Sequence, residues 1–471
     1  MSATPFGYTN RSAGIPAPAG LPWLGNLHQL PKGGFTQHLM RIAPDFDGIF
    51  SIDFAGYHAP FITSAELVAE VCDEKRFRKT IGPPLSILRP LAGDGLFTAN
   101  GDEPNWALAH RVLIPAFSQR ARRAYFDAML DVARQLVDRW KAREGQPIDL
   151  SDDMTRLTLE TITLCGFGVR FNTLQQDALH PFLAAMVRVL DEAMGRLTRL
   201  RFISRLRWSA NQQFRDDIAF MHGMVDDLVR ERRQASADSR AASRDLLGLM
   251  LDAEDPVTHQ RLPDENIRFQ VITFLIAGHE TTSGLLSFAL HLLLKHPQAL
   301  ARARAEAQAV WPPGHQPDYD ELGRLVVIEQ VLEETLRLWP TAPGFSVAPY
   351  QNETIGGGRY AIRKDERVTV LLPALHRDPK VWTDPQAFDI DRFAPDKRAQ
   401  ISTHAYKPFG SGSRACIGRQ FAMMEAKIAL ALILSNFEHI EEADGPYSLK
   451  VRETLTLKPE GLRLRVRTRK A

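Results

Sequence analysis

The chain has 471 residues, of which 44% are hydrophobic and 24% charged, and its formal net charge is +2. These proportions are ordinary for a soluble globular enzyme, and the small net charge argues against a nucleic-acid partner. Three cysteines are too few for a disulfide framework, so we expect a reducing, cytoplasmic location. The N-terminus lacks the roughly 20 apolar residues that a membrane span needs, so no membrane anchor is expected.

The first half of the chain predicts a short β region followed by many helices. Residues 1–35 are rich in proline and glycine and predict an extended lead-in. Residues 48–64 alternate in polarity and predict a hairpin that turns near Gly56. The pattern becomes helical over 64–79, and it stays helical almost throughout 106–250, where apolar residues recur three and four apart.

Two stretches of this region are exceptions to the apolar helical pattern. Residues 199–208 alternate between basic and apolar side chains, which fits either a solvated connection between helices or a mobile rim over an apolar entrance. Residues 232–245 are polar and predict a surface loop or a fraying helix end rather than a domain boundary.

The second half is built around one long predicted helix over 264–296, which begins after Pro263 and ends before Pro297. At 1.5 Å per residue it would be about 50 Å long. The remaining patterns predict a helix over 321–339 and small strands over 346–370, around the turn at Gly356–Gly358. They also predict an irregular segment over 376–408 and a hairpin over 451–466 with its turn at 459–461. The fold class is therefore mainly α with a minor β region.

The run F-G-S-G-S-R-A-C-I-G, from Phe409 to Gly418, is the most informative stretch of the sequence. Gly410 and Gly412 predict a tight turn through conformations that only glycine adopts cheaply. An apolar-periodic helix follows, so Cys416 lies at a helix start, where unpaired N–H groups and the dipole favour a thiolate. Arg414 adds a fixed positive charge close to that sulfur.

Several chemistries could use a lone thiolate, and the sequence narrows them. Zinc needs three or four nitrogen or sulfur ligands, but Cys72 and Cys165 lie in apolar helical contexts without C-x-x-C spacing. A catalytic cysteine needs a base, and none is evident nearby. Two interpretations stand open: an axial ligand to haem iron, or a small buried hydrophobic residue.

The centre of the long helix, F-L-I-A-G-H-E-T-T-S, departs from simple helical packing. Gly278 costs about 1 kcal/mol relative to alanine in a helix interior, so it needs a reason. Close approach of a flat ligand is one reason, and packing of another helix is the alternative. The Thr281 hydroxyl is expected to bond the carbonyl of Ala277, four residues back.

Together these motifs resemble those of the cytochromes P450. The run from Phe409 to Gly418 fills every specified position of the haem-binding pattern F-x-x-G-x-R-x-C-x-G, and A-G-H-E-T resembles the oxygen-binding groove A-G-x-[DE]-T. The resemblance implies a P450 fold with a long central helix and small sheets at the N-terminal side and the C-terminus. It also implies a single haem-thiolate domain over 1–471.

The resemblance further implies roles for individual residues around haem b. Cys416 would be the iron ligand, Arg414 would pair a haem propionate, and Phe409 and Gly410 would pack beside the sulfur. Other members of the predicted site fall into three groups: the oxygen groove with its proton relay, the propionate partners, and a network beneath the haem. In that order these are Ala277, Gly278, Thr281 and Glu280; then Trp106, His110 and Lys79; then Glu334, Arg337 and Arg392.

Two of these groups have simpler interpretations, and one departs from the family pattern. Trp106 and His110, one turn apart, also fit an ordinary amphipathic helix, and Glu334 with Arg337 also fits a surface pair. Ile390 and Asp391 replace the Pro and Glu that the family has before Arg392, which puts the local backbone in doubt.

Segments along nearly the whole chain, such as G-D-G-L-F-T and E-T-L-T-L-K-P-E-G, resemble bacterial self-sufficient fatty-acid hydroxylases. In these, the haem domain is fused to an NADPH-dependent diflavin reductase that carries FMN and FAD. This chain stops where the linker to the reductase would begin. We therefore expect that the reductase was removed by truncation or that a separate reductase serves this chain. The residues 120–123 form a basic cluster with Arg111 and Arg419. This cluster fits either a docking face for the reductase or a set of solvent-exposed charges without a partner protein.

The resemblance implies an apolar substrate channel lined by Phe97, Leu85, Leu88, Ala92, Leu197, Ile276, Ala342 and Leu455. Fatty-acid hydroxylases of this group place an arginine and a tyrosine at the channel mouth, where this chain has Tyr57 and Phe61. We therefore expect substrate binding to depend less on a carboxylate head group than it does in those enzymes. We also expect Tyr57→Arg to bind fatty acids more tightly.

The resemblance implies hydroxylation of unactivated C–H bonds of aliphatic substrates, and we expect medium- or long-chain fatty acids to be hydroxylated at subterminal carbons. The reaction would use dioxygen and electrons that NADPH supplies through a diflavin reductase. A peroxide-driven hydroxylase, a thiolate-haem isomerase, or a haem sensor or carrier without turnover are the alternatives. The Glu280–Thr281 pair argues against the first two of these.

Overall fold

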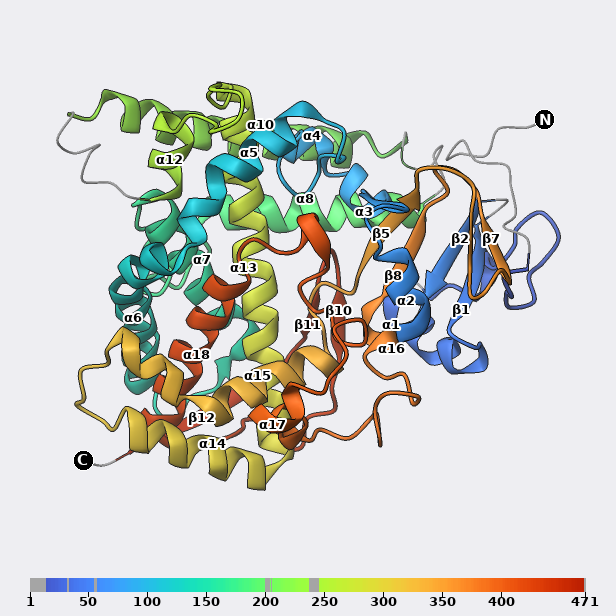
Figure 1. Ribbon diagram of the computed structural model, residues 1–471. Helices are drawn as coiled ribbons and strands as arrows, with labels where there is room; N and C mark the ends of the chain where they lie inside the picture. Colours follow the sequence, from blue (N-terminus) through green and yellow to red (C-terminus); the bar gives the residue numbers. More distant parts are fainter. Residues whose placement is uncertain are drawn as a thin grey trace. The chain divides into compact units, whose positions relative to one another are not determined.

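A computed structural model describes residues 14–31, 34–54, 57–199, 204, 206–236 and 245–469. They form two compact units (Figure 1). The sheet unit comprises Met1–Gly82, Glu333–Cys416 and Val451–Glu453; the helical unit comprises Pro83–Leu332, Ile417–Lys450 and Thr454–Ala471. Helices predominate and the sheets are small, as the sequence predicts.

The sheet unit is organised by a five-stranded sheet in the order β1-β2-β8-β5-β3. The strands are β1 (Ile49–Phe54), β2 (Tyr57–Ile62), β8 (Val368–Leu371), β5 (Gly344–Pro349) and β3 (Phe77–Thr80). Only β2 and β8 pair in parallel. The predicted hairpin is confirmed as β1 and β2, while its turn at Gly56 lies outside the described residues.

Shorter elements complete this unit around an apolar core. The helix α2 (Ala65–Val71) buries Leu67, Val68 and Val71 against Ile49 and Ile62 of the sheet. The other elements are η1 (Leu27–Gln29), α1 (Phe35–Ile42), η2 (Ala43–Asp45), β6 (Glu353–Ile355), β7 (Tyr360–Ile362), α16 (Leu372–Leu375), η5 (Ile390–Phe393), α17 (Pro395–Arg398), η6 (Gly412–Arg414) and β10 (Val451–Glu453).

The predicted helix over 64–79 is wrong beyond Val71. Asp73 accepts the N–H of Lys75 through its side chain, which stabilises a turn, and the chain then enters β3. Phe77 pairs with Pro349 of β5 and is buried. Tertiary strand pairing thus overrides a helical pattern that is weakened by four consecutive polar residues.

The helical unit is built around α13 (Asp264–Lys295), which confirms the long predicted helix to within one residue at its C-terminal end. It packs against α7 (Leu150–Phe167), α10 (Trp208–Gln234) and α18 (Arg419–Asn436), and Figure 1 shows it running among these helices. Burial on most sides explains why its sequence is apolar around nearly the whole circumference.

The helical pattern over 106–250 is confirmed by α5 (Pro104–Leu113), η3 (Ile114–Phe117), α6 (Gln119–Ala142), α7, α8 (Pro181–Thr198), α10 and α12 (Leu246–Asp252). The other helices of this unit are α3 (Pro83–Ser86), α4 (Arg89–Ala92), α14 (Pro297–Val310) and η4 (Tyr319–Arg324). The helix α15 (Val326–Leu338) continues into the sheet unit. Parts of the two exceptional stretches lie outside the described residues: 200–203 and 205 in the stretch at 199–208, and 237–244 in the stretch at 232–245.

The predicted C-terminal hairpin with its turn at 459–461 is wrong. The strand β12 (Arg463–Thr468) does not fold back on β11 (Leu457–Pro459) but pairs with β9 (Phe437–Glu442) and β4 (Ile148–Asp149). Alternation of apolar residues indicates strands in this segment, but it does not show that the predicted first arm is divided into β10 and β11, or which partner each strand takes.

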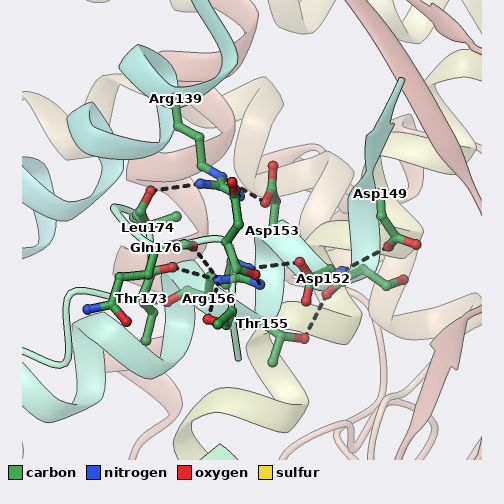
Figure 2. A network of polar contacts seen from close by, with 12 residues as sticks. Arg139, Asp149, Asp152, Asp153, Thr155, Arg156, Thr173, Leu174 and Gln176 are labelled. Atoms are coloured by element: carbon green, nitrogen blue, oxygen red, sulfur yellow. Dashed lines mark hydrogen bonds and ion pairs between the residues drawn. The ribbon is translucent and has the colours of Figure 1, made fainter. Parts of the chain in front are cut away.

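A buried arginine fixes α7, the neighbour of α13, to the loop that follows it (Figure 2). Arg156 is 3% exposed and donates hydrogen bonds to the carbonyls of Thr173, Gln176 and Asp177 at 2.7–2.9 Å. Its Nε also bonds Asp152 at 2.7 Å. These bonds satisfy the buried guanidinium and hold the 172–178 loop against the helix.

Candidate functional site

The cysteine loop lies in the sheet unit and has the predicted tight turn. Gly410 and Gly412 have φ of 77° and 67°, a region that favours glycine. The N–H of Gly410 donates to the Lys407 carbonyl at 3.0 Å, and the N–H of Cys416 donates to the Phe409 carbonyl at 2.8 Å. The thiol of Cys416 is exposed, which excludes the interpretation as a buried hydrophobic residue.

The ammonium of Lys79, from β3, lies against the backbone of this loop. Its Nζ donates to the Arg414 carbonyl at 2.8 Å. Burial and the neighbouring Arg414 charge lower the pKa of Lys79 to about 8, so the ammonium remains the main form at neutral pH. Contact with a haem propionate, which the sequence predicts for Lys79, stays a prediction.

The residues around Cys416 fit a single axial thiolate to haem iron. In the described part of the chain, no group of three or more His, Cys, Asp and Glu side chains is arranged to hold a metal ion. The other two cysteines differ from Cys416: Cys165 is buried and Cys72 partly so, and burial raises the pKa of both thiols. The glycine turn leaves the Cys416 sulfur accessible, which a haem ligand requires.

In the helical unit, one face of α13 is accessible at the centre of the helix. Ala277 is exposed and Thr281 is partly exposed, although their neighbours Ile276 and Thr282 are buried. The Thr281 hydroxyl donates to the Ala277 carbonyl at 2.9 Å, which confirms the predicted bond to the residue four positions back. This places a hydroxyl and small side chains together on one accessible face.

Packing against α7 accounts for Gly278. A Cβ at this position would lie 2.9 Å from Cγ1 of Ile162, which is too close for a side chain. The alternative of helix packing is therefore supported by the structure, and close approach of a flat ligand is not needed to explain this glycine.

The carboxylate of Glu280 is held by the adjacent His279 and by two residues that lie far away in the sequence. Thr456 donates to it at 2.9 Å, His279 Nε2 lies 3.2 Å away, and Lys458 Nζ lies 3.9 Å away. Burial by itself raises the pKa of Glu280, but Lys458, His279 and Thr456 outweigh it and hold the pKa well below its usual value. The carboxylate is therefore charged at neutral pH. His279 is buried and also bonds the Leu275 carbonyl, so its ring is held within the helix packing.

Trp106 and His110 stack on each other along α5. Their ring centroids are 4.9 Å apart and the ring planes differ by 19°. Both side chains are only partly buried, so each retains an accessible edge. Their predicted role as propionate partners stays a prediction.

The predicted network of Glu334, Arg337 and Arg392 is brought together in the sheet unit. Arg337 donates to both Glu334 oxygens at 2.7 and 2.8 Å, and both side chains are fully buried. Arg392 Nε lies 3.6 Å from Glu334 Oε1. Burial raises the pKa of Glu334, and Arg337 opposes this shift.

Ile390 and Asp391 do not disrupt this network. Ile390 is buried within η5, and the N–H of the preceding Asp389 donates to Glu334 Oε1 at 2.8 Å. Arg337 further donates to the carbonyls of His376, Pro385 and Ala387, so it ties together three separate points of the irregular segment.

The predicted substrate residues have different environments. In the helical unit Leu88, Ala92 and Ile276 are buried, while Leu85, Phe97, Leu197 and Leu455 are partly buried. In the sheet unit Ala342 is exposed, and Tyr57 and Phe61 are buried. Phe61 packs on Phe50 with centroids 5.6 Å apart, as part of a core cluster. The Tyr57 hydroxyl accepts a hydrogen bond from Arg367 at 3.1 Å.

Two members of the basic cluster already have acidic partners within the chain. Arg111 bonds both oxygens of Asp255 at 2.6 Å, and Arg123 pairs with Asp320. These pairs reduce the positive charge that the cluster offers to a partner protein.

Sequence reasoning missed several polar groups beside the predicted residues. Lys458 and Thr456 lie next to Glu280, and Arg367 lies next to Tyr57. Burial raises the pKa of Glu425 to about 8, and its carboxyl bonds the hydroxyls of Thr161 and Thr282. Only Glu425 had a visible signal, a single acid in the apolar run F-A-M-M-E-A-K-I-A-L.

Comparison with known proteins agrees with these observations. The family described as Cytochrome P450 matches residues 15–466. A "Bifunctional cytochrome P450/NADPH--P450 reductase 2" of Bacillus subtilis is 48% identical over 98% of this chain, and a "Bifunctional cytochrome P450/NADPH--P450 reductase" of Bacillus cereus is 46% identical over 97%. The chain spans 43% and 42% of the lengths of these two relatives.

A solved structure shares the fold over its whole length. The "Crystal structure of cytochrome P450DA heme domain" is 48% identical, covers 98% of both chains and superposes with a TM-score of 0.92. Among the described residues, no helix combines the length and apolar character that crossing a bilayer requires. With the Cys416 loop and the accessible face of α13, these findings show that the chain belongs to the cytochrome P450 family.

Proposed function

We propose that this protein is a haem-thiolate monooxygenase that hydroxylates unactivated C–H bonds of aliphatic substrates, with medium- and long-chain fatty acids as the first substrate class. The observation that carries the proposal is the exposed Cys416 thiol, held in a glycine turn of a family whose members bind haem iron through a cysteine thiolate. The haem supplies the iron that activates dioxygen.

The chain's own residues would bind that cofactor and supply protons. Cys416 would provide the axial thiolate, while Arg414, Lys79, Trp106 and His110 would neutralise or bond the propionates. Thr281 places a hydroxyl beside the exposed Ala277, where it can donate or accept a proton. Glu280 would help to relay protons toward Thr281; its contacts with Lys458, His279 and Thr456 keep the carboxylate ionised in this structure.

Electrons are proposed to come from NADPH through a diflavin reductase that carries FAD and FMN. Two curated relatives are named as fusions of a cytochrome P450 with an NADPH–P450 reductase, and this chain corresponds to less than half of each. A partner with the same chemistry, fused or separate, would serve this chain. Its three cysteines are too few for a disulfide framework, which fits the cytoplasmic location that we propose.

The direct test is to combine the haem-loaded protein with a soluble diflavin reductase, NADPH and a fatty acid. We expect hydroxylated product to form in proportion to the NADPH consumed. Product that forms only with added hydrogen peroxide would instead identify a peroxide-driven hydroxylase. Binding without any product would identify a sensor or carrier.

The structure refines the expected recognition of a carboxylate. The sequence places Tyr57 where fatty-acid hydroxylases have arginine, but Arg367 supplies a guanidinium that bonds the Tyr57 hydroxyl. We propose that this pair binds the substrate carboxylate. An added arginine in Tyr57→Arg would lie next to Arg367, so repulsion is expected to offset the tighter binding that the sequence predicts.

Arg367→Gln is expected to weaken binding of a fatty acid about tenfold, because a charged hydrogen bond to the carboxylate is lost. Binding of the corresponding fatty alcohol should change little. The measurement is the dissociation constant from a spectral titration with each ligand. Arg363→Gln, at an exposed neighbouring position, is the control. Equal fatty-acid affinity in wild type and Arg367→Gln would exclude this assignment.

A further inference from the structure

The segment that joins α2 to β3 contacts the cysteine loop through Glu74. One oxygen of the Glu74 carboxylate accepts the backbone N–H of Ser413 at 2.9 Å and the Ser413 hydroxyl at 2.7 Å. The preceding Gly412 packs against the same carboxylate, since a Cβ there would lie 2.5 Å from it. Glu74 thus explains why position 412 needs a glycine for space as well as for its φ of 67°.

Lys79, five residues later, holds the next residue of the loop. Its ammonium donates to the Arg414 carbonyl at 2.8 Å. A Cβ at Gly410 would lie 3.8 Å from this nitrogen, so the ammonium also lies close to the start of the turn. The side chain is fixed from the other side by Phe345, whose ring centroid is 5.8 Å from Nζ.

One short segment therefore supplies a carboxylate and an ammonium that bind two consecutive loop residues. Glu74 accepts the N–H of Ser413, and Lys79 donates to the C=O of Arg414. A loop with two glycines of positive φ loses much conformational freedom when it is fixed. Hydrogen bonds from its backbone to charged side chains restrain it more strongly than hydrogen bonds to neutral side chains would. Both contacts lie within the sheet unit, together with Cys416 itself.

We propose that Glu74 and Lys79 are positioning residues that fix the 410–414 turn and thereby the direction of the Cys416 sulfur. This inference rests on the proposed role of Cys416 as the haem ligand. Neither side chain needs to touch the iron or the substrate, because each acts through the backbone of the loop. Their loss should weaken the iron–thiolate bond without removing the thiolate.

Glu74 allows the sharper test, since Lys79 is also a predicted propionate partner. We would prepare Glu74→Ala and Glu74→Gln as haem-loaded full-length proteins, with Glu66→Ala and Glu66→Gln as controls. Glu66 is an exposed acid on α2, the helix that precedes Glu74 in the sequence, so the controls carry the same change of charge.

Three properties would be measured for every variant: hydrogen exchange of the Ser413 amide, the haem reduction potential, and the urea concentration at which the red-shifted carbonyl band of the ferrous protein disappears. We expect exchange at Ser413 to rise roughly tenfold in Glu74→Ala, as expected for loss of a hydrogen bond to a charged group. Glu74→Gln, which keeps an acceptor oxygen, should fall between Glu74→Ala and wild type. The potential and the urea midpoint should shift in the same order, and both Glu66 variants should match wild type.

The outcomes separate this inference from the proposed function. Wild-type exchange, potential and urea midpoint in Glu74→Ala would overturn the positioning role. Equal shifts in the Glu74 and Glu66 variants would also overturn it, because they would indicate a general effect of charge. If Cys416 were not the ligand, Cys416→Ser would keep the red-shifted band, whereas exchange at Ser413 would still respond to Glu74.

Discussion

Replacing Arg337 with leucine is expected to leave too little folded protein to bind haem. The Arg337 side chain is fully buried and bonds Glu334 as well as the carbonyls of His376, Pro385 and Ala387. Its removal takes the main cationic partner from the buried Glu334 carboxylate, which keeps the Asp389 N–H and the more distant Arg392, and it takes a donor from three carbonyls. Breaking a buried ion pair from one side costs about 3–5 kcal/mol, a large part of the 5–15 kcal/mol that is typical of a folded domain.

The measurement is the yield of soluble protein and its free energy of unfolding in urea. Arg398→Leu is the matched control. Arg398 pairs with Glu333, which lies on α15 as Arg337 does, but the Arg398 side chain is 33% exposed. We expect the control to lose about 1 kcal/mol or less, as partly exposed pairs do. Wild-type stability in Arg337→Leu would show that the network is dispensable.

Thr281→Ala is expected to separate NADPH consumption from product formation. The hydroxyl lost is the one that lies beside Ala277 on the accessible face of α13. General acid–base groups typically contribute about 100-fold or more to a rate, so product formed per NADPH should fall by at least about tenfold. Reduced dioxygen should appear as hydrogen peroxide instead. The ratio of product to NADPH, with peroxide measured in parallel, tests this expectation.

Ser287→Ala provides the control on the same helix. The Ser287 hydroxyl bonds the carbonyl of Ser283 at 2.7 Å, which is the same contact four residues back, but it is completely buried. The loss of such a bond alone should therefore leave the ratio unchanged. If Ser287→Ala and Thr281→Ala lowered the ratio equally, the effect of Thr281 would be structural rather than a matter of proton supply.

The long helix shows which parts of the fold can be predicted from the sequence. Pro263 and Pro297 delimit α13, and prolines mark helix ends through their fixed φ and missing N–H. The segment after Val71 was mispredicted because its strand depends on pairing with β5, which is distant in the sequence. The C-terminal strands were found, but the partner of β12 was not, for the same reason.

The candidate site divides in the same way. Cys416 and Thr281 lie in short motifs whose local geometry, a glycine turn and a back-bonded hydroxyl, follows from neighbouring residues. The charged groups that contact these motifs come from remote segments of the sequence: Lys458 lies beside Glu280, and Glu74 lies beside Ser413. No local pattern connects them, so only the folded chain shows the contacts.

The most direct test of the central claim is the carbon-monoxide difference spectrum of the reduced protein, recorded for wild type and for Cys416→Ser. Our account predicts the red-shifted Soret band of thiolate-bound haem in wild type and its absence in Cys416→Ser. A variant that retains the band, or a wild-type protein that holds no haem, would contradict the assignment of Cys416 as the iron ligand.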